Sequence, residues 1–146
     1  MSSQYIPKDI RRRVAKAARY RCGYCLTAQT IIGPLLEIDH IIPEAQGGSS
    51  NEENLWLACP LCNASKSDRV MVLDSETSVT VPLFNPRQDI WIDHFRWLED
   101  GTIIHGLTAI GRATVETLNM NHPDVVVARQ LWVTAGWHPP PDSVIF

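Results

Sequence analysis

The sequence predicts an α+β fold of short elements organised around two Cys-x-x-Cys pairs. Apolar residues recur at helical spacing near the N-terminus, short runs bounded by turn residues follow, and helical patterns return towards the C-terminus. A chain of 146 residues is long enough to bury a core. We expect a first domain over 1–70 and an α+β extension of unassigned role over 71–146.

The composition is that of an ordinary folded protein, with 45% hydrophobic and 20% charged residues. No apolar run approaches the roughly 20 residues that a membrane span needs. No apolar stretch typical of a secretory signal follows the N-terminus. We therefore expect a cytoplasmic protein without a membrane partner.

Charge is distributed unevenly along the chain, although the net value is only −3. Residues 1–30 hold seven basic residues and one acidic residue, a balance of +6, whereas the rest of the chain holds six basic and fifteen acidic residues, a balance of −9. Positive charge gathered at one end favours a polyanionic partner. The alternative is a basic helix face that is merely solvated.

The four cysteines form two pairs, and none is left over. The cytosol keeps thiols reduced and zinc takes tetrahedral thiolate, so two such pairs indicate a structural zinc site rather than disulfides. The 33 residues between the pairs exceed the usual spacing of a compact zinc ribbon, which indicates an inserted functional segment. The four predicted zinc ligands are Cys22, Cys25, Cys59 and Cys62.

A helix is predicted from about Pro7 to Tyr20, because proline suits a first helical turn and apolar residues recur at helical spacing behind it. Basic side chains project from the other faces of this helix. Arg11 and Arg12 are candidate phosphate contacts. The apolar positions are Ile6, Ile10, Val14 and Ala17.

A short strand is predicted over 35–41, after Gly33-Pro34. Strand alternation places Asp39 and His40 on opposite faces unless the strand bends or ends there, as Pro43 allows. Ser50 to Glu53 has capping-box spacing for one helical turn.

The return strand of a hairpin is predicted over 55–58, and it brings the second cysteine pair beside the first. A helix is then expected to begin at Asn63, with Lys66 and Arg69 one turn apart on one face.

The extension is predicted to contain two hairpins and two helices. An Asp-Gly turn joins the strands of the second hairpin. The predicted elements are strands over 71–73 and 78–81, strands over 90–98 and 102–105, helices from Thr108 to Met120 and from Pro123 to Ala135, and an extended tail over 137–146.

Four motif pieces occur in a fixed order within 20–69: Asp39-His40-Ile41-Ile42-Pro43, Gly47-Gly48, Asn51-x-x-Asn54-Leu55 and Cys59-x-x-Cys62-Asn63-x-x-Lys66. Together they resemble the HNH endonuclease motif, in the version whose two cysteine pairs bind a structural zinc. The resemblance implies a small zinc-stabilised ββα-metal core, preceded here by the N-terminal helix. The chain departs from the usual pattern at Ser67, where the family has glycine.

The resemblance also implies residue roles. His40 is the general base that takes a proton from water, a task for which an imidazole is suited. Asp39 and Asn63 supply oxygen ligands to a catalytic Mg²⁺ or Mn²⁺. Asn54 holds the catalytic loop and orients His40, and is counted with Asn63 among the catalytic residues. Lys66 and Arg69 contact nucleic-acid phosphates.

The leading functional hypothesis is a metal-dependent HNH endonuclease that hydrolyses phosphodiester bonds in DNA. The main alternative is a non-catalytic zinc-dependent nucleic-acid-binding module of the same fold, and a zinc-stabilised protein-interaction adaptor is a third. DNA is the expected partner, and RNA stays open as an alternative. A monomer suits nicking of one strand, whereas a homodimer suits cleavage of both.

Overall fold

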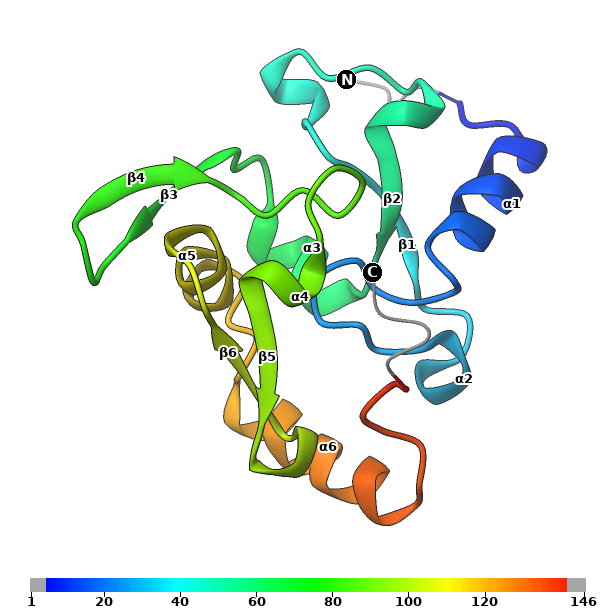
Figure 1. The fold of residues 1–146 in the computed structure, drawn as a ribbon. Helices are drawn as coiled ribbons and strands as arrows, with labels where there is room; N and C mark the ends of the chain where they lie inside the picture. The colour runs from blue at the N-terminus through cyan, green and yellow to red at the C-terminus, as the bar shows by residue number, and fades with distance from the viewer. Residues whose placement is uncertain (1–4, 142–146) are drawn as a thin grey trace. The chain divides into compact units, whose positions relative to one another are not determined.

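The computed structural model describes residues 5–141, and the chain divides into two compact units (Figure 1). The first unit runs to Val70 and includes Asn85–Gln88, and the second contains Met71–Phe84 and the chain from Asp89 onward. Arg87 belongs to the first unit because its guanidinium donates to Leu55 O at 3.1 Å. Within the described residues, no helix is long and apolar enough to cross a membrane.

The first unit has a strand, strand, helix order preceded by a longer helix. Strand β1 pairs antiparallel with β2, and Asp39 lies opposite Trp56 while His40 lies opposite Leu55. This order confirms the α+β prediction for the first part of the chain. The elements are α1 (Lys8–Ala17), α2 (Gln29–Ile32), β1 (Glu37–His40), η1 (Glu44–Gln46), η2 (Glu52–Asn54), β2 (Leu55–Ala58) and α3 (Pro60–Lys66).

The apolar side of α1 packs on the strand pair, where Figure 1 shows α1 alongside β2. Val14 and Leu55 are both fully buried and form a core cluster with Ile6. Ile10 and Ile38 pack against this cluster, as the helical spacing predicts. Removal of this apolar surface from water stabilises the contact between helix and sheet.

Three boundaries differ from the predicted ones. Helix α1 ends at Ala17, because the chain turns left-handed at Tyr20 and the residue before it. The predicted capping box at Ser50 does not form, and a 3₁₀ turn capped at Asn51 without a side-chain hydrogen bond stands in its place. Strand β1 covers only the second half of the predicted strand.

Helix α3 begins three residues before the predicted start, at Pro60. Cys59 caps it, because its Sγ accepts a hydrogen bond from Cys62 N at 3.4 Å. The helix ends at Lys66, where Ser67 has a φ of 51°. Arg69 therefore lies beyond the helix, and the prediction of one helix face shared by Lys66 and Arg69 is wrong.

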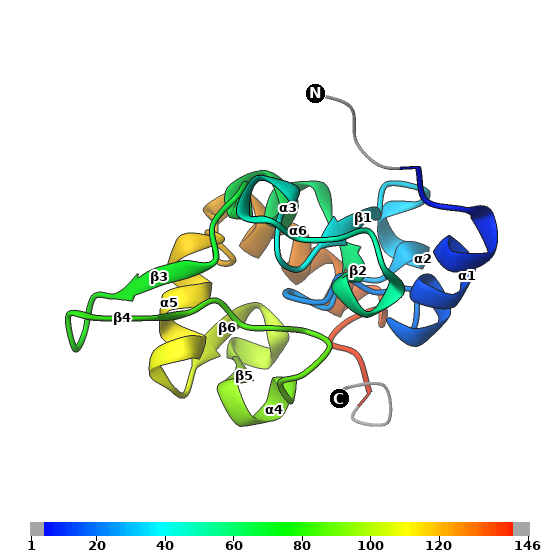
Figure 2. The same cartoon turned by 90° about the horizontal axis from the view of Figure 1, so that it is seen from above.

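The second unit also mixes helices with small antiparallel sheets, which confirms the α+β class. Strand β3 pairs with β4, β5 pairs with β6, and Figure 2 shows α5 beside β6. The elements are β3 (Met71–Asp74), β4 (Val79–Pro82), α4 (Trp91–His94), β5 (Phe95–Leu98), η3 (Glu99–Gly101), β6 (Ile103–Gly106), α5 (Ala109–Thr117) and α6 (Pro123–Thr134).

The predicted strand over 90–98 is half helical, because a single turn, α4, precedes β5. The turn buries Trp91 to 2% exposure and brings its ring 5.1 Å from that of Phe95 and 5.5 Å from that of Trp97. Aromatic packing thus outweighs the local strand preference.

The helix termini of the second unit follow the capping residues in the sequence. Thr108 Oγ1 accepts from Gly111 N at 3.0 Å at the start of α5. Helix α6 begins at Pro123, and Gly136, with a φ of 82°, follows its end. The predicted extended tail lies partly outside the described residues.

Candidate functional site

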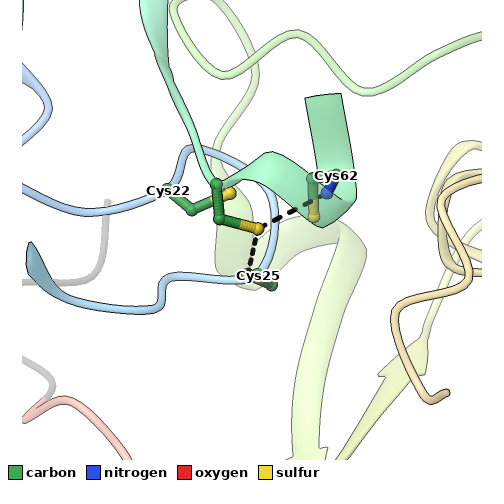
Figure 3. A group of neighbouring side chains, drawn as sticks. Cys22, Cys25 and Cys62 are labelled. Atoms are coloured by element: carbon green, nitrogen blue, oxygen red, sulfur yellow. Dashed lines mark hydrogen bonds between the residues drawn. The ribbon is translucent and has the colours of Figure 1, made fainter. Parts of the chain in front are cut away.

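The four cysteines converge on one point in the first unit. All four are buried, and their Sγ atoms lie within 4.8 Å of one another. Figure 3 shows Cys22, Cys25 and Cys62 with their sulfur atoms turned together. Sulfur atoms around zinc lie about 3.8 Å apart, since each Zn–S bond is about 2.3 Å. The 3.7 Å distance between Cys25 Sγ and Cys59 Sγ therefore fits a structural zinc.

Glycine is required in the first cysteine turn. A Cβ at Gly23 would lie 2.3 Å from Trp56 Cδ1, so a larger residue would push the cysteine turn away from β2. Burial raises the pKa of the Cys22 thiol, whereas hydrogen bonds from the other thiols lower the pKa of Cys25. A divalent cation would compensate the thiolate charge and release protons on binding.

Asp39 faces inward, between β1 and α3. Its side chain is 3% exposed, and its Oδ2 accepts from the Tyr24 hydroxyl at 2.8 Å. Burial and the Asp39 carboxylate raise the pKa of Tyr24, so the phenol keeps its proton and donates. Tyr24 lies between the two cysteines of the first pair, so this bond links the cysteine cluster to Asp39.

Lys66 completes the surroundings of Asp39. Its Nζ donates to Asp39 Oδ1 at 3.0 Å and to His40 O at 2.7 Å, and the side chain is 1% exposed. The sequence predicts an exposed phosphate contact at Lys66. The structure corrects this, because both the ammonium and its stem lie inside the protein.

Asn63 lies one helical turn before Lys66 and contacts a different carboxylate. Its Nδ2 donates to Glu37 Oε1 at 2.8 Å. Glu37 and Asp39 are on the same face of β1, so the strand and α3 are joined by two successive polar pairs. The Glu37–Asn63 pair is half exposed, and the Asp39–Lys66 pair is buried.

These donors do not fit the hydrated cation that Asp39 and Asn63 are predicted to share. Mg²⁺ keeps several waters and needs open oxygen ligands. Both Asp39 oxygens are engaged in a buried setting, and Asn63 is turned to Glu37. Cation binding between Asp39 and Asn63 would require Lys66 to leave the carboxylate.

His40 points to the opposite face of β1 from Asp39, as strand alternation predicts. The strand is paired through both residues, so no bend turns them together. His40 Nε2 lies 2.8 Å from Ser50 Oγ and 3.8 Å from Glu44 Oε1. The side chain is 17% exposed, which leaves one part of the ring open to solvent.

A groove of about 640 Å³ runs past His40. Its floor is apolar and includes Ile38, and its rim carries Arg11 from α1 and Glu44 from η1. Arg11 Nε donates to Ile6 O at 3.0 Å, which anchors the guanidinium at the groove. The predicted phosphate contact at Arg11 and the predicted base thus share one cavity.

Asn54 fastens the loop that follows β1. Its Nδ2 donates to Ile42 O at 2.9 Å and to Ser49 O at 2.7 Å, and its Oδ1 accepts from Ile42 N at 2.9 Å. A Cβ at Gly48 would lie 1.7 Å from Ile42 O, so the loop closes only with glycine there. Asn54 holds the loop that carries Ser50 without contacting His40.

The family comparison decides how this arrangement is classified. Residues 22–69 match the HNH endonuclease family. The matched part is about a third of the chain and contains the cysteine cluster, Asp39, His40, Asn54 and Asn63. Comparisons with curated proteins and with solved structures return no match. The HNH resemblance is confirmed for this segment, which indicates a nuclease or a nucleic-acid-binding module.

The other predicted contacts of the HNH segment and its flank occupy separate places. Arg12 lies on a different side of α1 from Arg11, in a hollow with Lys16. Arg69 is exposed, and its NH1 donates to Ser65 O at 2.7 Å.

Sequence reasoning did not single out four residues of the HNH segment that contact the predicted site residues. Alternation along β1 was the available signal for Glu37, which lies two residues before Asp39. The others have no motif signal, because tertiary contacts place them. The four are Tyr24, Glu37, Glu44 and Ser50.

Proposed function

We propose that the protein is an endonuclease that hydrolyses phosphodiester bonds in DNA with His40 as the general base. The observation that carries the proposal is the partly open His40 ring, which is held by Ser50 beside a groove within the HNH segment. An imidazole that is fixed at one nitrogen and open at the other is suited to draw a proton from an attacking water.

The contacts of His40 indicate which nitrogen acts. When Ser50 Oγ accepts the Nε2 proton, the lone pair is on Nδ1 and faces away from Ser50. Proton uptake at Nδ1 makes the ring positive, and the Glu44 carboxylate, 3.8 Å from Nε2, compensates that charge. Ser50 and Glu44 therefore act as positioning residues for the base.

Basic side chains around the groove supply the substrate contacts. Arg11 lines the same cavity as His40 and is the proposed contact to the phosphate being cleaved. Arg12 and Arg69 are proposed to contact phosphates further along the strand. Asn54 keeps the loop of Ser50 in place and so preserves the His40 geometry.

Two metals enter the proposal in different ways. The cysteine cluster fits one structural zinc, which would fasten the first cysteine turn to β2 and α3. A catalytic Mg²⁺ or Mn²⁺ on Asp39 and Asn63 is implied by the HNH resemblance alone. Because the arrangement of these donors does not fit a hydrated cation, the proposed chemistry is carried by the residues of the chain.

Cleavage of supercoiled plasmid tests the proposal. Purified protein with Mg²⁺ or Mn²⁺ is expected to nick the plasmid, and His40→Ala is expected to abolish nicking. His105→Ala is the matched control, because this exposed histidine lies in the second unit. Equal zinc content and equal Tm in the two variants would exclude misfolding. Nicking by His40→Ala at the wild-type rate would overturn the role of His40, and EDTA tests the metal dependence.

A non-catalytic nucleic-acid-binding module is the second candidate. It is favoured by the buried Asp39–Lys66 pair, which is turned away from His40. In the same experiment, a plasmid that is retarded in the gel but not cut under any metal condition would support this candidate.

A further inference from the structure

The exposed side of α1 carries a row of three basic residues, Lys8, Arg12 and Lys16, here called the α1 stripe. They recur every four residues, so they lie on neighbouring turns about 6 Å apart along the helix axis. All three are exposed, and within the described residues none has an ion pair. The opposite side of the helix carries the buried Val14.

Arg13 is adjacent to the α1 stripe but differs from it in its contacts. Its guanidinium binds Glu52 at 2.9 Å and Asp9 at 3.4 Å. Its charge is therefore compensated within the first unit. This leaves the α1 stripe as uncompensated positive charge, and it provides a matched arginine on the same helix.

Tyr20 stands at the C-terminal end of the α1 stripe with 48% of its surface exposed. Two shallow hollows meet at this residue. One is shared with Arg12 and Lys16, and the other with Arg19 and Gln29. An aromatic side chain between two open hollows in a basic surface is suited to stack on a nucleobase.

The backbone presents Tyr20 in an unfavourable conformation. Arg19 has a φ of 55° and Tyr20 a φ of 56°, in the left-handed region that glycine adopts more easily. Hydrogen bonds from Tyr20 N to Ala15 O, at 2.9 Å, and from Gln29 N to Tyr20 O, at 2.8 Å, hold the turn. Helices commonly end in this conformation with glycine, so an aromatic residue here is retained despite the strain.

We propose that the α1 stripe and Tyr20 form a binding surface for a DNA strand with unpaired bases. The three cations pair with successive phosphates, and the Tyr20 ring stacks on a base that a duplex would keep in its own stack. The choice of DNA rests on the proposed function, although the binding is independent of cleavage. The substrate of the nuclease would then contain a single-stranded stretch beside the cleaved position.

Fluorescence anisotropy tests the α1 stripe. The full chain, loaded with zinc and carrying His40→Ala to prevent cleavage, is titrated with a labelled single-stranded 20-mer and with the corresponding duplex over a range of salt concentrations. Combined Lys8→Gln, Arg12→Gln and Lys16→Gln is expected to lower the magnitude of the salt slope for the single strand by about 2, at about 0.7 for each phosphate contact. Arg13→Gln is the matched control and is expected to keep the slope.

Tyr20 is tested in the same assay. Tyr20→Ala is expected to weaken single-strand binding about tenfold or more and to leave duplex binding unchanged. Tyr20→Gly is expected to raise Tm, because glycine relieves the backbone strain, while it weakens single-strand binding equally. A residue with only a structural role would not separate stability from binding in this way.

The outcomes are distinct from those of the cleavage test. An unchanged salt slope in the triple variant, or wild-type single-strand affinity in both Tyr20 variants, overturns the inference even when plasmid is cut. Expected binding changes in a protein that cuts nothing support the inference and reject the proposed nuclease.

Discussion

Lys66 Nζ lies 3.0 Å from Asp39 Oδ1, and the two side chains are 1% and 3% exposed. This buried ion pair joins β1 to α3 directly beside His40, whose carbonyl oxygen also accepts from Lys66. The sequence motif brings these residues together as functional candidates, but in the folded protein they first serve to hold the strand against the helix. Their roles in stability and in chemistry are therefore separable by experiment.

Breaking this pair on one side is expected to destabilise the protein strongly. Lys66→Met leaves the Asp39 carboxylate buried without its counter-charge, which costs about 3–5 kcal/mol in comparable pairs. Asp39→Asn leaves the ammonium in the same position. Urea denaturation with zinc present measures the loss.

A combined Asp39→Asn and Lys66→Met variant is expected to recover part of that stability, because no buried charge is left uncompensated. Arg69→Met, at an exposed position, is the control. Single variants as stable as the wild type would contradict the buried arrangement.

One zinc ion per chain is expected in protein purified without added metal. Cys59→Ser should lose the zinc and unfold the first unit, because folding free energy and metal-binding free energy are coupled there. Elemental analysis measures the stoichiometry, and circular dichroism measures the folding. Tyr24→Phe is the control, since it removes only the 2.8 Å bond to Asp39 and leaves the four sulfurs in place. A folded, zinc-free wild-type protein would exclude this role for the cysteines.

The orientation of His40 is expected to depend on Ser50. Ser50→Ala removes the partner 2.8 Å from Nε2, so the ring loses its fixed position and nicking should slow about tenfold. Initial rates on supercoiled plasmid measure the effect. Ser75→Ala, which removes an exposed hydroxyl of the second unit, should leave the rate unchanged. Equal rates for both variants would remove Ser50 from the proposed mechanism.

The sequence predicts the local order of the first unit well because its signals are local. Turn residues bound the strand pair, the cysteine spacing indicates where the chain returns, and the apolar spacing identifies the buried side of α1 around Val14. Helix ends were less predictable. Helix α1 stops early because Tyr20 adopts a left-handed conformation that its residue type disfavours, and α3 starts early because Cys59 acts as its cap.

The candidate site was predictable in its membership more than in its geometry. Motif spacing identifies Asp39, His40 and Asn63, and alternation correctly predicts that the first two face apart. Spacing carries no information on which partner each side chain finds in three dimensions. The burial of Lys66 and the turn of Asn63 to Glu37 follow from the packing of α3 on β1.

The second unit is expected to lose stability in acid through Asp74. This buried carboxylate accepts from Arg112 NH2 at 2.9 Å and from Thr77 Oγ1 at 2.6 Å, and these contacts hold its pKa well below the usual range. The stabilisation is fully present above the unfolded-state pKa near 3.8 and is lost as the pH falls through the folded-state value. Asp74→Asn should therefore lower Tm at pH 7, and the difference from the wild type should shrink steadily as the pH falls below about 4. Thermal unfolding followed by tryptophan fluorescence measures this, with the exposed Asp93→Asn as control. A Tm difference that stays constant from pH 7 to pH 2 would show that the Asp74 contacts do not depend on its charge.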